Sequence, residues 1–183
     1  MKNQSIKRRW TSVALALIVS FGAVSSSSGT QVARGEGGES GENYDIMFTK
    51  WVACYSDQKD CEASDGAMVV GTMPGIITGG DAGTGDFYGE ILDVIQSTPD
   101  LWEAVTVYQI HGTTHEFSAH MLVMEDSATG EATLVGIIVD GWLKGQTVQG
   151  SYNTVSSCPD NPSQPPDPLS PCYVVTLHIH AGD

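Results

Sequence analysis

The chain has 183 residues, and its 22 acidic residues against 8 basic ones give it a net charge of −14. A surface of this kind repels phosphate backbones and anionic lipids, so nucleic acid and anionic membranes are not expected partners. We expect the acidic residues to form a solvated face that keeps the protein soluble. A surface that binds cations or basic partners is the alternative.

The first 25 residues have the three-part layout of a secretory signal. Four basic residues in the first nine positions precede an apolar run at 13–19, and small residues up to Ser25 offer a cleavage site. The apolar run is shorter than the ~20 residues that a membrane-spanning helix needs. We therefore expect a secreted or extracytoplasmic protein that has no membrane contact after cleavage. An uncleaved anchor is the alternative.

Residues 26–43 are rich in Gly, Ser and Glu. Such a stretch cannot bury enough apolar surface to offset the entropy lost on ordering, so we predict a disordered linker. Residues 44–183 show no second shift in composition, and their number is sufficient for one domain with its own core.

The predicted domain contains eight short strand-like runs separated by turns rich in Gly, Asp, Asn and Pro. Evenly spaced short strands mostly form a sandwich or a closed barrel, and short connections favour antiparallel neighbours. Pro74 interrupts the second run, which indicates an edge or a bulge. A short helical turn is also predicted over 98–103. The predicted strands are 45–55, 67–78, 86–96, 102–110, 114–125, 132–139, 146–155 and 173–180.

Two of these strands are apolar on both faces, over 121–124 and 135–139. We expect one face of each to line the interior and the other to be covered by a packed loop or a partner subunit. A homo-oligomer is therefore one expectation.

The four cysteines of an exported chain are expected to form disulfides, and three pairings are possible. Proximity favours Cys54 with Cys61, and Cys158 with Cys172. The second pair brackets six of the eight prolines, which indicates a rigid connection between two strands. No Cys-x-x-Cys spacing is present, so we expect no metal or redox role for these residues.

Four segments resemble a known family: Thr84 to Leu92, His115 to Ala119, Asp140 to Gly145 and Cys172 to Leu177. They are similar to bacterial exported proteins of the allene oxide cyclase-like barrel group, to which plant dirigent proteins are distantly related. The resemblance implies an all-β fold, a single eight-stranded antiparallel β-barrel of calycin type with an apolar cavity. It further implies action on a small hydrophobic molecule without a cofactor, in one ring-closure or coupling geometry.

Four side chains are candidates for such a cavity: Tyr88, Glu90, Tyr108 and Tyr152. If they face the interior, they supply the few polar groups that a small-molecule pocket needs. Glu90 is the candidate catalytic acid, since burial would raise the pKa of its carboxyl group. The alternative is that the tyrosines are core residues with satisfied hydroxyls.

The histidines indicate a functional site less clearly than the four cavity candidates do. His178 and His180 share one strand face and are spaced to bind Zn or Cu, but two ligands are too few for a closed metal site. The alternative, an exposed polar face, is favoured, and no metal is expected. Glu116 and His120 also share a face, which we expect to point outward.

These observations lead to three functional hypotheses. The first is a cofactor-independent isomerase or cyclase that acts by positioning its substrate. The second is a non-catalytic secreted protein that carries a small molecule in the same cavity. The third is a structural envelope module whose interior is filled by side chains. Polar groups converging on a cavity favour an enzyme, an unbroken apolar wall favours a carrier, and a filled interior excludes both.

Overall fold

The computed structural model describes residues 41–56, 60–156, 158 and 171–182. The predicted signal, the predicted linker up to residue 40, and most of the segment between Cys158 and Cys172 lie outside the described residues. In the part that is described, the regular structure consists of strands. No helix there has the length and apolar character needed to cross a membrane.

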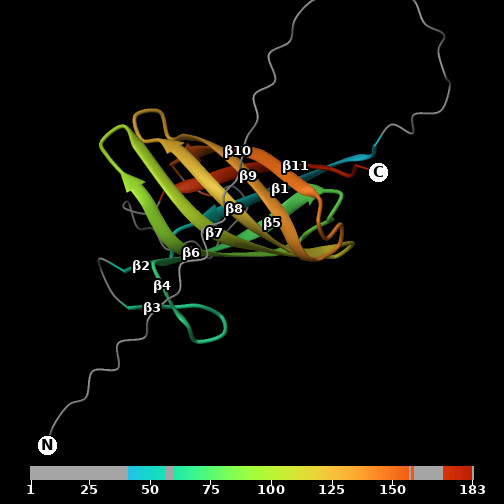
Figure 1. Cartoon of the computed structure of the whole chain (residues 1–183), viewed down its shortest axis with the longest axis horizontal. Coiled ribbons are helices and arrows are strands. Elements are labelled where there is room, and N and C mark those ends of the chain that lie inside the picture. The colour runs from blue at the N-terminus through green and yellow to red at the C-terminus, as the bar shows by residue number, and fades with distance from the viewer. Residues whose placement is uncertain (1–40, 57–59, 157, 159–170, 183) are drawn as a thin grey trace, which may run out of the picture. The chain divides into compact units, whose positions relative to one another are not determined.

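Eight long strands form a closed antiparallel ring (Figure 1). From β5 to β11 each strand pairs with the next one in the chain, and β1 closes the ring by pairing with both β11 and β5. The predicted all-β fold and eight-stranded antiparallel barrel are therefore confirmed. The ring consists of β1 (Asn43–Trp51), β5 (Gly71–Gly80), β6 (Gly85–Ser97), β7 (Leu101–Gly112), β8 (Glu116–Asp126), β9 (Glu131–Gly141), β10 (Thr147–Val155) and β11 (Cys172–His180).

Three short strands lie outside the ring. β2 (Cys54–Tyr55) pairs with the start of β5, and β3 (Cys61–Glu62) pairs with β4 (Met68–Val69) in a small hairpin. The predicted strand 45–55 is therefore divided, because β1 pairs with Gly75–Gly80 whereas β2 pairs with Gly71 and Thr72. Pro74 lies between these two pairings, and on its other side it pairs with Tyr88 of β6, so β5 continues through it without a register shift.

The helical turn predicted over 98–103 is wrong, because β6 and β7 are joined there by a tight reversal. Thr98 N donates to Leu101 O at 2.8 Å, and Leu101 N donates to the Thr98 side-chain oxygen at 3.1 Å. These two bonds bring the ends of neighbouring strands together. Leu101 itself already belongs to β7.

Alternate residues of each strand fill the interior, as Ala104, Thr106, Tyr108 and Ile110 do on β7. An aromatic stack occupies the middle of the barrel. The rings of Phe48 and Phe87 stack with centroids 4.3 Å apart, and Tyr108 packs edge-on against Phe87 at 5.1 Å. This stack separates a packed half of the interior from the half that contains the cavity described below.

Both predicted disulfides, Cys54–Cys61 and Cys158–Cys172, are confirmed. The first joins β2 to the small hairpin. The second anchors the start of β11, where Cys158 and Cys172 pack against Trp51. Two disulfides are consistent with an oxidising extracellular environment.

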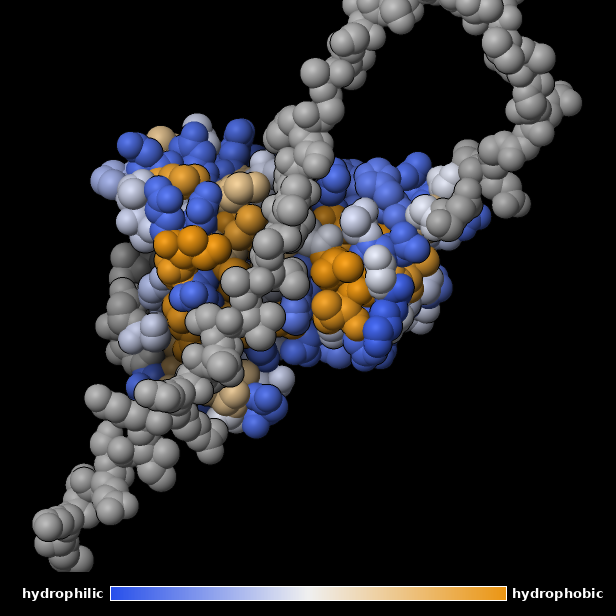
Figure 2. All heavy atoms as spheres, in the orientation of Figure 1, coloured by the Kyte–Doolittle hydropathy of each residue, from blue (hydrophilic) through white to orange (hydrophobic). Residues whose placement is uncertain are grey.

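The outer face of the barrel carries apolar side chains on β8 and β9. Leu122 pairs with Val135 across these strands, and both are partly buried, whereas Ile137 is 46% exposed. Figure 2 shows hydrophobic side chains in patches among hydrophilic ones on the viewed face. The outer face of 135–139 is thus only partly covered in the single chain. That a partner subunit covers it stays a prediction.

The close packing around the aromatic stack predicts that Gly89→Val is destabilising. A Cβ atom at Gly89 would lie 3.0 Å from both the Phe87 ring and Met73 Cε. Overpacking of this kind costs about 1–3 kcal/mol, which urea denaturation measures as a loss of unfolding free energy. Gly182→Val is the control, because nothing lies within 4 Å of a Cβ atom there. Equal stability of the two variants would contradict the packing described.

Candidate functional site

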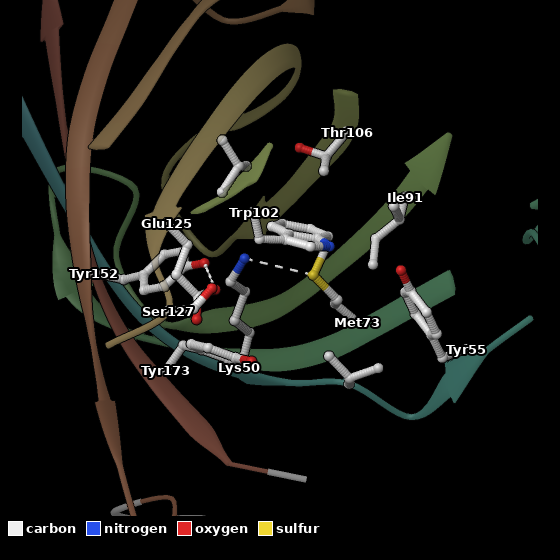
Figure 3. A pocket seen from close by; sticks show the side chains of 12 residues that line it. Lys50, Tyr55, Met73, Ile91, Trp102, Thr106, Glu125, Ser127, Tyr152 and Tyr173 are labelled. Atoms are coloured by element: carbon white, nitrogen blue, oxygen red, sulfur yellow. Dashed lines mark hydrogen bonds between the residues drawn. The ribbon is translucent and has the colours of Figure 1, made fainter. Parts of the chain in front are cut away.

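A cavity of about 250 Å³ occupies one end of the barrel. It lies where β1, β8 and β10 end and where β5, β7 and β11 begin, and Ile91 from the middle of β6 also lines it (Figure 3). Its volume is just below the ~300–1,000 Å³ that is usual for ligand pockets, so the space suits a small molecule. The lining residues are Lys50, Val52, Tyr55, Met73, Ile91, Trp102, Thr106, Val123, Glu125, Ser127, Tyr152 and Tyr173.

Lys50 occupies an inward position of β1, where alternation places it on the same side as Ile46 and Phe48. Its side chain is only 2% exposed. The amine donates a hydrogen bond to Tyr108 Oη at 2.5 Å and contacts Met73 Sδ at 3.5 Å. The β1 strand therefore delivers a lysine amine to the inside of the barrel.

Three tyrosine rings surround the Lys50 amine. Its Nζ lies 4.6 Å from the ring centroid of Tyr108, 4.9 Å from that of Tyr152 and 5.5 Å from that of Tyr173. At such distances the negative faces of aromatic rings attract a cation. The three rings thus stabilise the charged form of an amine that has lost its water.

Burial nevertheless lowers the pKa of Lys50 to about 7, and the negative charge of Glu125 opposes this shift only in part. No carboxylate of the described residues lies within ion-pair distance of the amine. Near neutral pH a substantial fraction of Lys50 is therefore the free amine, the form that acts as a base or a nucleophile.

A second polar group in the cavity is the pair Tyr152–Glu125. Tyr152 Oη donates to Glu125 Oε2 at 2.5 Å. Burial, reinforced by the charge of Glu125, raises the pKa of Tyr152, and burial also raises the pKa values of Tyr108 and Tyr173. All three tyrosines therefore remain protonated phenols near neutral pH and retain a proton to donate.

Two of the four predicted binding residues lie inside the barrel. Tyr152 lines the cavity, and the Tyr108 ring lies between the aromatic stack and the Lys50 amine. Both are also tightly packed residues with bonded hydroxyls, as the alternative interpretation expected. The structure thus brings Tyr108 and Tyr152 together around a third residue, Lys50.

Tyr88 and Glu90 lie on the other face of β6, because Phe87, Gly89 and Ile91 take its inward positions. The Glu90 carboxylate is buried outside the ring, next to the loop that joins β3 to β4. It accepts bonds from Ser64 N at 3.4 Å, Ser64 Oγ at 3.3 Å and Gln109 Nε2 at 3.5 Å. The carboxylate that lines the cavity is Glu125 and not Glu90.

The sequence reasoning missed Lys50, Glu125 and Tyr173 as lining residues, although a signal for the first two is present. Lys50 continues the apolar alternation of Ile46 and Phe48, and Glu125 continues that of Met121 and Val123. A charged side chain that occupies an inward position of an alternating strand is a candidate for a functional site.

The histidines of β11 lie on the exposed face, as the favoured interpretation expected. His178 Nδ1 is 2.6 Å from Asp45 Oδ1, and His180 Nδ1 is 2.7 Å from Asn43 Oδ1. Glu116 and His120 are also exposed, as predicted. Within the described ranges, no group of three or more His, Cys, Asp or Glu side chains is arranged to hold a metal ion.

No family model, curated protein or solved structure matches this chain. The resemblance to the allene oxide cyclase-like group therefore stays a prediction, and the functional interpretation rests on the geometry of the cavity.

The buried amine predicts that stability depends on pH in a way that Lys50→Met removes. With a folded pKa near 7, Lys50 binds fewer protons than it does in the unfolded chain above that pH, so unfolding free energy rises with pH. The wild type should gain about 2 kcal/mol relative to Lys50→Met between pH 7 and pH 9, measured by urea denaturation at each pH. Lys144→Met, at an exposed lysine, is the control and should follow the wild type. A constant difference between wild type and Lys50→Met would show that the amine is not desolvated.

Proposed function

We propose that the barrel binds a small, mainly apolar molecule in its cavity. The observation that carries this proposal is the unequal filling of the interior, which is packed around Phe48 and Phe87 but hollow beyond Lys50. A filled interior would favour the structural envelope module instead. Apolar lining residues such as Val52, Met73 and Ile91 offer contact to an apolar body, and the polar groups of the same lining can orient the ligand.

A second candidate function is a cofactor-independent isomerase or cyclase, and the convergence of polar groups favours it. A buried amine, three phenols (those of Tyr55, Tyr152 and Tyr173) and one carboxylate line a single space. Groups of this kind can donate or accept protons while the walls hold one substrate geometry, and positioning alone contributes up to about 7–11 kcal/mol to catalysis. The catalytic candidates are then Lys50, Tyr152 and Glu125 in place of Glu90.

We also propose that the protein functions after export. The two disulfides support this location, since such bonds persist in oxidising compartments and are rare in the cytosol. The layout of the first 25 residues supports it independently. A secreted carrier and a secreted enzyme are both compatible with this location.

Native mass spectrometry of the protein purified from its own host tests the binding proposal. We expect a small molecule to remain bound and to be lost on denaturation. The uncharged probe 3-phenylpropan-1-ol should also bind, measured by calorimetry. Absence of both signals would contradict the proposal.

Ser127→Trp should weaken binding of the probe at least about tenfold, or 1.4 kcal/mol. Ser127 is an exposed residue on the lining of the cavity, and a large ring at this position would obstruct the space. Ser151→Trp is the matched control. Ser151 is exposed on β10, on the face opposite to Tyr152, and its replacement should leave the affinity unchanged. Equal affinities for the two variants would place the binding site elsewhere.

A further inference from the structure

We propose that Lys50 forms a Schiff base with an aldehyde or ketone group of the molecule bound in the cavity. This inference rests on the proposed function and specifies the chemical class of its ligand. The ligand would combine a small apolar body, in contact with the walls, with one carbonyl group at the Lys50 end of the space.

The position of the amine supports the proposal. In Figure 3 the Lys50 side chain extends from β1 toward the centre of the cavity, with its nitrogen between the tyrosines and Met73. The rest of the side chain is held by the strand and its buried surroundings. A carbonyl group in the cavity beside Met73 therefore meets the nitrogen at the end of a fixed side chain.

The surroundings of the amine favour a nucleophile over a structural charge. A lysine buried for its charge is normally paired with a carboxylate. Glu125 lies in the same cavity, yet its carboxylate accepts the Tyr152 hydroxyl and is not within ion-pair distance of Lys50. The phenol and the thioether that Lys50 contacts carry no negative charge, and the ring faces stabilise its charged form only in part, so the desolvated amine can exist without its proton.

The main rival is a ligand whose carboxylate pairs with the charged Lys50. Such a ligand would bring a second carboxylate into a small, poorly solvated space that Glu125 already lines. Like charges in such a space repel, and one lysine cannot compensate both. A neutral carbonyl group adds no charge, so the geometry favours an aldehyde or ketone over an acid.

The chemistry balances without any further reagent. The free amine nitrogen bonds to the carbonyl carbon, the carbonyl π electrons move to the oxygen, and one amine proton transfers to that oxygen to give a carbinolamine. The C–O bond then breaks, and the hydroxyl group leaves with the second amine proton as water while the C=N bond forms.

Reductive trapping of the full chain tests this proposal. The protein is incubated with 3-phenylpropanal and sodium cyanoborohydride, which reduces an imine to a stable secondary amine, and the modified residue is found by peptide mapping. We expect Lys50 to be labelled at least about tenfold faster than the exposed Lys144 of the same molecule at pH 7. Lys50→Met should abolish this label. The peptide map of the unaltered chain still decides the question if that variant does not fold.

The pH profile separates a reactive amine from a merely accessible one. The labelling rate of Lys50 is divided by that of Nα-acetyllysine in the same solution, so that the reagent's own pH dependence cancels. An amine of pKa near 7 should give a ratio that is constant at pH values well below 7 and falls as pH rises from about 7 toward 10, where the free lysine also loses its proton. A ratio that does not change with pH would overturn the proposal.

Failure of this proposal can be distinguished from failure of the proposed function. Binding of 3-phenylpropan-1-ol without preferential labelling of Lys50 overturns the Schiff base and leaves the binding proposal intact. Tighter binding of 3-phenylpropanoate than of the alcohol, lost in Lys50→Met and without labelling, overturns it in favour of the anion site. If neither the alcohol nor the aldehyde binds, both proposals fail.

Discussion

The closure of the sheet by β1 is the constraint on which the rest of the structure depends. This strand pairs along one edge with β11 and along the other with β5, so the ring has no open edge and acquires an inside. The seam with β5 is tight, since a Cβ atom at Gly75 would lie 2.1 Å from Thr49 O. Only glycine permits this approach. The strand that closes the barrel is also the strand that carries Lys50, and its position in the seam fixes the amine within the interior.

The size of the side chains decides which part of the barrel interior is filled and which part is hollow. Around Phe48 and Phe87 the rings meet and leave no room for a ligand. Lys50 follows two residues after Phe48 on the same face of β1, and from there the long, thin side chain and its tyrosine neighbours leave a space. The cavity therefore begins at the lysine, so that any molecule inside it lies close to the amine.

Much of the fold could be predicted from the sequence, because apolar alternation and turn residues are local signals. They located the eight long strands, but they could not distinguish a barrel from a sandwich, since closure depends on the pairing of β1 with β5 across the chain. The break after Trp51 could not be predicted either, because it is visible only in the strand pairing. β1 pairs with Gly75–Gly80 of β5, whereas β2 pairs with Gly71 and Thr72 of the same strand. The disulfides were predictable from proximity.

The candidate site was only partly predictable, and β6 and Lys50 show why. In β6 both faces carry aromatic and apolar residues, so alternation alone could not decide whether Phe87 or Tyr88 faces inward. Nothing local reveals that the β3–β4 loop covers Glu90. Lysine is almost never fully buried, so the residue type at position 50 does not indicate an interior side chain. The alternation of inward residues Ile46 and Phe48 along β1 does indicate that Lys50 faces the interior.

The burial of Lys50 costs the folded protein stability, and this cost is itself an argument about function. Methionine has a similar length and would occupy the same position without desolvating a charge, and substitutions of that kind are often neutral or stabilising. The rings of Tyr108, Tyr152 and Tyr173 offset the loss of water only in part, since the pKa of the amine remains low. An ion pair with Glu125 would hold the charge more firmly, yet that carboxylate is bonded to Tyr152. The interior thus holds a desolvated amine at the expense of stability, which is the pattern expected of a functional group and not of a packing residue.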